Sequence, residues 1–134
     1  MFFASKFVNL AFVVLVNKGS IGVLPQGFTN KNAIITLPGG QNNYCESQRE
    51  CAQRILKNSG IYVNEKDLKP MSLCSYNKDV TLYVYTLYEC KKWNANFKNF
   101  KKLMWVKDVD VEKYYFPRPQ KKLLSRYFNR AAIF

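Results

Sequence analysis

The stretch from residue 38 to residue 61 constrains the fold of this chain more than any other. An apolar, β-like run at 33–37 leads into Pro-Gly-Gly at 38–40, and a polar loop follows it. Apolar residues at helical spacing then predict a helix from about Glu46 to Gly60, where glycine readily adopts the left-handed conformation that ends helices. The sequence therefore predicts a strand, a glycine turn, a loop and a helix in immediate succession.

Charged residues and glycines of this stretch follow a recognisable spacing. Five residues separate Gly40 from Glu46, seven separate Glu46 from Arg54, and the pair Gly60-Ile61 closes the helix. The pattern resembles the Nudix box, although the closing glycine-aliphatic pair comes one residue earlier than in that family. The resemblance implies that the Glu46 carboxylate and the Arg54 guanidinium brace the loop against the helix through a bidentate contact.

The remaining elements follow in the order expected of the same family. Aromatic and β-branched runs predict strands at 7–16, 21–24, 33–37, 71–76, 80–88 and 103–111. Pro25 is expected to end the second strand, because proline cannot donate to a ladder, and a loop is expected at 28–32. A basic amphipathic helix is predicted at 119–134. The resemblance implies one α/β (α+β) domain over residues 1–134, a Nudix-like α/β/α sandwich with a mixed β-sheet between helices.

The distribution of charge indicates the kind of partner. With 134 residues, 48% hydrophobic and 16% aromatic, the chain can bury a core as one domain. Its net charge is +12; residues 91–134 hold twelve Lys or Arg against three acids, whereas residues 1–90 hold nine against six. A basic C-terminal part indicates a polyanionic partner such as nucleic acid, a phosphorylated nucleotide or an anionic surface. A solvated basic face is the alternative.

Cysteine and histidine usage argues against several kinds of site. The four cysteines form no Cys-x-x-Cys pair and the chain has no histidine, which disfavours zinc, a disulfide framework and any Ser-His or Cys-His arrangement. We expect reduced thiols in an intracellular protein, either cytoplasmic or nuclear. The apolar run at 10–16 is too short for a membrane span and precedes a turn at 17–20, so it predicts a buried first strand and no membrane partner.

The predicted helix lacks the acids that a divalent metal needs. Ile55 and the run at 57–59 stand where the Nudix family has the glutamates that hold its metal, and hard cations require oxygen ligands. The resemblance therefore implies a degenerate Nudix box, lost hydrolysis and no cofactor. The alternative is a divergent hydrolase of nucleoside diphosphate derivatives or capped RNA. Glu46 and Glu50 are then the candidate catalytic residues and the candidate ligands of Mg²⁺ or Mn²⁺.

Basic and aromatic residues indicate how the chain can bind a polyanion instead. Trp93, Phe97 and Phe100 alternate with lysines in a loop expected at 90–102, the mixture that stacks bases and contacts phosphates of single strands. Burial of these aromatic residues in the core is the alternative. The glycine turn before the helix can receive an anion, and a plain turn is the alternative. The predicted RNA- or nucleotide-binding residues are Gly39, Gly40, Arg54, Lys91, Lys92, Trp93, Lys101, Lys102, Lys121, Lys122 and Arg126.

A third class of function also fits the sequence. A Nudix-like fold can act as a structural subunit, with its surface used by a protein partner or by a second copy in a homo-oligomer, because a fold by itself does not fix a function. Contacts with a protein partner keep an apolar core, so they survive high salt better than contacts with phosphates. Salt dependence therefore separates the two kinds of binding.

Overall fold

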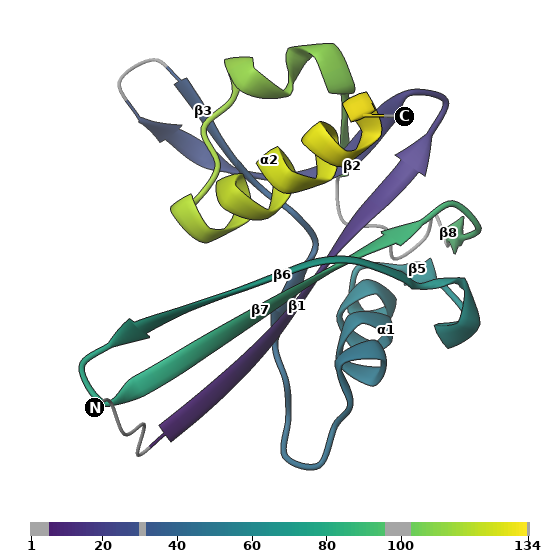
Figure 1. Ribbon diagram of the computed structural model, residues 1–134. Coiled ribbons are helices and arrows are strands. Elements are labelled where there is room, and N and C mark those ends of the chain that lie inside the picture. Colours follow the sequence, from purple (N-terminus) through teal and green to yellow (C-terminus); the bar gives the residue numbers. More distant parts are fainter. Residues whose placement is uncertain (1–5, 30–31, 96–102, 134) are drawn as a thin grey trace.

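A mixed β-sheet lies between two helices in the computed structural model, which describes residues 6–29, 32–95 and 103–133 (Figure 1). Helix α1 (Gln48–Asn58) packs on one face of the sheet, and helix α2 (Arg118–Ile133) packs on the other. This arrangement is the α/β/α sandwich expected from the order of the elements. No helix in these three ranges is long and apolar enough to cross a membrane.

Two long parallel strands form the centre of the sheet. The main sheet contains β1 (Lys6–Asn17), β2 (Ser20–Thr29), β3 (Asn32–Thr36), β4 (Gly39–Gln41), β6 (Lys69–Lys78), β7 (Thr81–Cys90) and β9 (Met104–Lys107). β1 pairs with β7 in parallel, β7 forms the predicted antiparallel hairpin with β6, and the strand order is β3-β2-β1-β7-β6. β4 pairs with β1, and β9 pairs with β2.

Short elements complete the described chain. A second, two-stranded sheet joins β5 (Ile61–Tyr62) to β8 (Asn94–Ala95). Two 3-10 helices are η1 (Glu65–Asp67) and η2 (Asp108–Lys113). β5 follows α1 directly, so the small sheet brings the segment after β7 close to the C-terminal end of α1.

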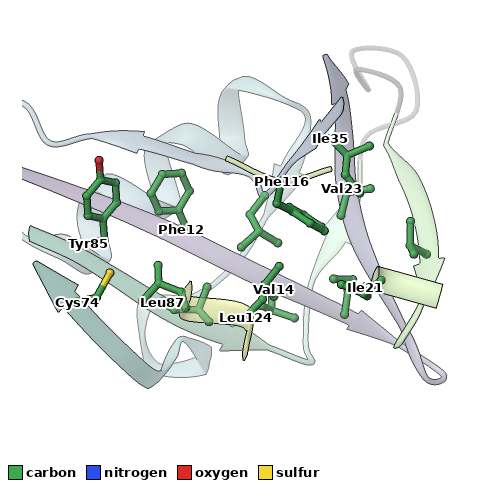
Figure 2. Close-up of a cluster of buried hydrophobic side chains, with 14 residues drawn as sticks. Phe12, Val14, Ile21, Val23, Ile35, Cys74, Tyr85, Leu87, Phe116 and Leu124 are labelled. Carbon is green, nitrogen blue, oxygen red and sulfur yellow. The ribbon is translucent and has the colours of Figure 1, made fainter. Parts of the chain in front are cut away.

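The central strand β1 is buried on both faces, as its continuous apolar sequence predicts. Successive side chains of a strand point to opposite faces of the sheet. Ala11, Val13 and Leu15 accordingly pack in one core with α1, whereas Phe12 and Val14 pack in the other with α2. The second core is drawn in Figure 2. One strand therefore anchors both helices.

A buried polar contact fixes the start of α2 against the end of β3. The Leu37 amide donates to Gln120 Oε1 at 2.8 Å, and Gln120 Nε2 donates to Thr36 Oγ1 at 2.7 Å. Gln120 is 6% exposed, so its amide would be costly to bury without these partners. The contact places the N-terminal end of α2 beside the chain that enters the glycine turn.

Several predicted boundaries differ from the structure. Pro25 does not end β2; it lies opposite Ile35, and the register shifts between Pro25 and Gly27, an irregularity that lets a residue without an N–H sit in the strand. A loop was expected at 28–32, but β2 extends to Thr29 and β3 begins at Asn32, and these two residues are paired with each other. The predicted last strand at 103–111 divides into β9 and the 3-10 helix η2.

Candidate functional site

The first turn of α1 is closed by its own side chains. Ser47, not Glu46, precedes the helix: the Glu50 amide donates to Ser47 Oγ at 3.0 Å, and the Ser47 amide donates to Glu50 Oε1 at 3.1 Å. This reciprocal pair is a capping box, which satisfies two amides that a helix start leaves without partners. The helix therefore begins two residues later than the sequence predicted, and Glu50 serves as part of its cap.

The loop before α1 is braced by the predicted bidentate contact. Arg54 Nε donates to Glu46 Oε2 at 2.7 Å, and Arg54 Nη2 donates to Glu46 Oε1 at 3.0 Å. The Asn43 amide donates to the same Oε1 at 2.9 Å, and Arg54 also donates to the Gln41 carbonyl at 3.0 Å. Hydrogen bonds from Arg54 lower the pKa of Glu46 despite partial desolvation. Glu46 is thus an ionised carboxylate with both oxygens in use.

The two glycines of the turn lie in the sheet ladder. Gly39 is paired with Phe12 and Gly40 with Ala11. A Cβ at Gly39 would lie 2.3 Å from the Ala11 carbonyl oxygen, so only glycine permits this approach of two backbones. The sequence predicted a phosphate contact at this turn; the structure places the turn within β4, against β1.

The described acids do not form a site for a divalent cation. Mg²⁺ and Mn²⁺ need several oxygen ligands that converge on one point. Glu46 is held by Arg54, Glu50 caps the helix, and no group of three or more Cys, Asp or Glu in the described ranges lies close enough to hold a metal. The residues present at α1 therefore do not fit the metal that a Nudix box implies.

Ile55 and Ser59, two of the positions at which the resemblance to the Nudix box implies glutamates, have other contacts. Ile55 packs against the core beneath α1, and a Cβ on Gly40 would lie 3.1 Å from its Cδ1. Ser59 ends the helix, with its amide donating to the Leu56 carbonyl at 3.0 Å. Glu89 cannot supply the missing acid, because it lies on the α2 side of the sheet, where Tyr127 donates to it at 2.5 Å.

Two adjoining depressions run from the exposed side of α1 to the segment after β7. The first has a volume of about 780 Å³ and is lined by the exposed side of α1 and by Tyr62 and Val63. The second, of about 450 Å³, shares Tyr62 and Val63 and is also lined by Lys91, Lys92 and Trp93. We call the two together the α1–β5 groove. It brings the predicted residues Arg54, Lys91, Lys92 and Trp93 onto one surface.

Trp93 has partners of its own within the protein. Its ring stacks on Trp105 with centres 5.3 Å apart, and its Nε1 donates to the Val16 carbonyl at 3.3 Å. The residue is half-buried and packs at the margin of the core beneath α1. It forms a fixed wall of the groove, with part of its surface accessible to a ligand.

Sequence reasoning missed a cation and an aromatic ring of the groove, Lys57 and Tyr62. Lys57 is exposed on α1 one turn after Arg54, and Tyr62 in β5 is 42% exposed. Helical periodicity places Lys57 on the same side as Arg54, which is the signal that could have found it. Tyr62 carries no such signal, because its position depends on the pairing of β5 with β8.

The predicted binding residues of α2 lie on another surface. Lys121, Lys122 and Arg126 are exposed on α2, across the sheet from the α1–β5 groove, so they do not form one surface with Lys91 and Lys92. Lys121 lines a depression with η2, whereas Lys122 faces β6. The predicted contacts Lys101 and Lys102, with the aromatic residues Phe97 and Phe100, lie outside the described residues.

Comparison with known proteins identifies the fold. No protein-family profile and no curated protein matches the sequence. The solution structure of the E. coli ORF135 protein superposes with a TM-score of 0.76 at 17% identity, covering 95% of this chain and 93% of that one. A MutT NUDIX hydrolase from Burkholderia pseudomallei gives 0.71 at 13% identity, covering 91% and 98%. A NUDIX hydrolase from Nitrosomonas europaea gives 0.72 at 10%, covering 92% and 90%. This chain has the Nudix fold.

Proposed function

We propose that this chain is a degenerate Nudix-fold protein that binds single-stranded RNA, or a related nucleotide polyanion, and does not hydrolyse it. The observation that carries the proposal is the α1–β5 groove, in which cations and aromatic rings line one continuous surface beside a helix whose acids are already engaged. Phosphoanhydride hydrolysis in this fold family depends on a divalent ion, and the donor set at α1 does not fit one.

The charges of the groove favour an anion. Arg54 neutralises the charge of Glu46. The other acids that line the groove are Glu50 and Asp67. They are outnumbered by its exposed lysines, which are Lys57, Lys91 and Lys92. Lys91 also lies 3.7 Å from Glu89, but the lysine side chain is 71% exposed, so this ion pair is weak and can be exchanged for a phosphate. Tyr62 and Trp93 add aromatic surface on which bases can stack.

Replacing Lys91 and Lys92 with alanine is expected to weaken binding of a labelled single-stranded RNA about tenfold at physiological salt. Each lysine neutralises one phosphate, so the slope of log Kd against log salt should fall by about 1.4 in magnitude when both are replaced. Fluorescence anisotropy over a salt series measures both quantities. Thermal melting of the variant checks that both exposed positions tolerate alanine.

The matched control is the double replacement Lys107→Ala/Lys113→Ala, which removes the same charge from exposed positions outside the groove. A general effect of net charge would weaken RNA binding equally in both double variants and would count against the groove. An RNA Kd that does not change over the salt series would count against a contact dominated by phosphates. Capture of a protein partner that persists in high salt, without RNA binding, would favour the scaffold function instead.

Addition of Mg²⁺ or Mn²⁺ is expected to leave the melting temperature unchanged. An ion present at a hundredfold excess over its Kd would add about 2.7 kcal/mol of stability. For a domain of this size such a gain would raise the melting temperature by roughly 5–10 °C. The measurement is thermal unfolding with and without each ion at matched ionic strength. A rise of several degrees, together with metal-dependent release of product from nucleoside diphosphate derivatives or capped RNA, would establish the hydrolase instead.

A further inference from the structure

Four aromatic rings form a row on the face of the sheet that α2 covers only in part. Phe12 and Tyr85 stack with ring centres 5.9 Å apart, and Figure 2 shows them side by side. Tyr76 stacks on Tyr85 at 5.8 Å and on Tyr83 at 5.0 Å, with the planes of each pair no more than 14° apart. Tyr76 lies between Tyr85 and Tyr83 in this row, and because it belongs to the edge strand β6, 40% of it is exposed.

A pocket between β6 and the start of α2 adjoins the exposed ring of Tyr76. Its volume is about 420 Å³, and its lining residues are Cys74, Ser75, Tyr76, Arg118, Pro119 and Lys122. The lining thus contains two cations, two hydroxyl groups and no acid. Burial raises the pKa of Cys74, so its thiol is neutral and adds no negative charge. The pocket combines an aromatic surface with uncompensated positive charge.

The positive charge continues along the same side of α2. Lys122 follows Arg118 by four residues and Arg126 follows Lys122 by four, so the three side chains lie on successive turns. Arg126 Nη1 donates to the Leu73 carbonyl at 2.6 Å, which holds its guanidinium against β6. The sequence has no Asp or Glu after Glu112, so no acid of α2 itself neutralises these cations.

We infer that this pocket, the β6–α2 pocket, is a second nucleotide-binding site, which seats one unit of a single-stranded RNA. The base packs against the exposed part of the Tyr76 ring, as bases do on aromatic platforms, and the stacking of this ring on Tyr85 and Tyr83 holds it in place. Its phosphate lies between Arg118 and Lys122, which are about 6 Å apart along the helix axis. The inference rests on the proposed function, but it uses the opposite face of the sheet from the α1–β5 groove.

Two RNA probes separate the base contact from the phosphate contact. One is a labelled oligouridine of about ten nucleotides, and the other is an abasic strand of the same length. Tyr76→Ala is expected to weaken oligouridine binding about tenfold and to leave the abasic strand unchanged, whereas Tyr76→Phe retains the wild-type affinity. Arg118→Ala/Lys122→Ala is expected to weaken both probes about tenfold and to lower the salt slope by about 1.4.

The same control pair, Lys107→Ala/Lys113→Ala, measures the effect of net charge alone. The β6–α2 pocket is refuted, with the proposed function intact, if Lys91→Ala/Lys92→Ala weakens RNA binding while Arg118→Ala/Lys122→Ala behaves like the control. Equal weakening of both probes in Tyr76→Ala would refute the contact between the base and the Tyr76 ring. If neither probe binds the wild type, the proposed function fails and this inference fails with it. Thermal melting of each variant shows whether it is still folded, so that weaker binding can be assigned to the replaced side chain.

Discussion

Replacing Gly39 with alanine is expected to lower the free energy of unfolding by about 3 kcal/mol or more, the upper range for overpacking in a tight site. The new Cβ would lie 2.3 Å from the Ala11 carbonyl oxygen, 2.4 Å from Phe12 Cδ1 and 2.8 Å from Phe12 Cα. Two of these three atoms belong to the backbone of β1, which is buried in both cores and cannot move aside. The strand β4 must therefore separate from β1, and the loop before α1 loses its anchor.

Gly40→Ala is the matched control for this prediction. The Cβ there would meet only Ile55 Cδ1, at 3.1 Å, which is the flexible end of a side chain. Alanine also restricts the unfolded chain more than glycine does, so we expect a change within about 1 kcal/mol of zero. Urea denaturation of the two variants measures the difference. Equal stability of both variants would show that β4 does not pair with β1 as closely as described.

Much of the fold was predictable because its signals are local. The period-two and continuous apolar runs at β1 and β7 specify buried strands, and the spacing of Glu46 and Arg54 specifies the brace. The capping box of Ser47 and Glu50 was also visible as a Ser-x-x-Glu pattern. Giving that pattern priority over apolar spacing would have placed the start of α1 correctly.

Other boundaries depend on partners that are distant in sequence. Pro25 stays in β2 because the register between β2 and β3 shifts beside it. This shift is a property of the paired strands and cannot be read from the sequence of either one. β4 is three residues long and contains two glycines, so only its pairing with β1 makes it a strand. Such short or irregular strands have too few residues to show a period of their own.

Candidate binding residues were the least predictable part, because composition does not say which face a residue occupies. Lys92 and Lys122 are both exposed and basic, yet one lines the α1–β5 groove and the other lies across the sheet. The alternation of side chains along β7 does predict the face that Glu89 occupies. Its side chain lies on the same face of the sheet as Tyr85 and Leu87, which is the face opposite α1. Basic residues that form one basic region in the sequence therefore lie on two surfaces, one on each side of the sheet.

Glu46→Gln is expected to lower the free energy of unfolding by about 2 kcal/mol at neutral pH. The carboxylate accepts two hydrogen bonds from Arg54 and one from the Asn43 amide, and charge-assisted bonds of this kind contribute more than neutral ones. Its side chain is 13% exposed and that of Arg54 is 33% exposed, so solvent screens the pair only in part. A double-mutant cycle with Arg54→Ala isolates the coupling between the two side chains.

The pH dependence of this destabilisation has a definite sign. Hydrogen bonds from Arg54 lower the pKa of Glu46 below its usual value of 4.5, so the folded state binds this proton less readily than the unfolded state does. The carboxylate therefore stabilises the fold fully above its unfolded pKa, and this stability is lost as pH falls through the lower, folded pKa. The wild type and Glu46→Gln should differ most at neutral pH and converge as the pH falls below the folded pKa of Glu46.

An exposed ion pair provides the comparison that tests whether the brace, rather than surface charge in general, is responsible. Lys113 and Asp110 are 3.0 Å apart but 75% and 37% exposed, so Asp110→Asn should change stability by less than about 0.5 kcal/mol. If Glu46→Gln is no more destabilising than this variant, or if its effect persists unchanged at acidic pH, Glu46 does not brace the loop. A strong, pH-dependent destabilisation would instead show that the Glu46 carboxylate is required to hold the loop before α1, so it cannot bind a divalent ion unless the loop loses this contact.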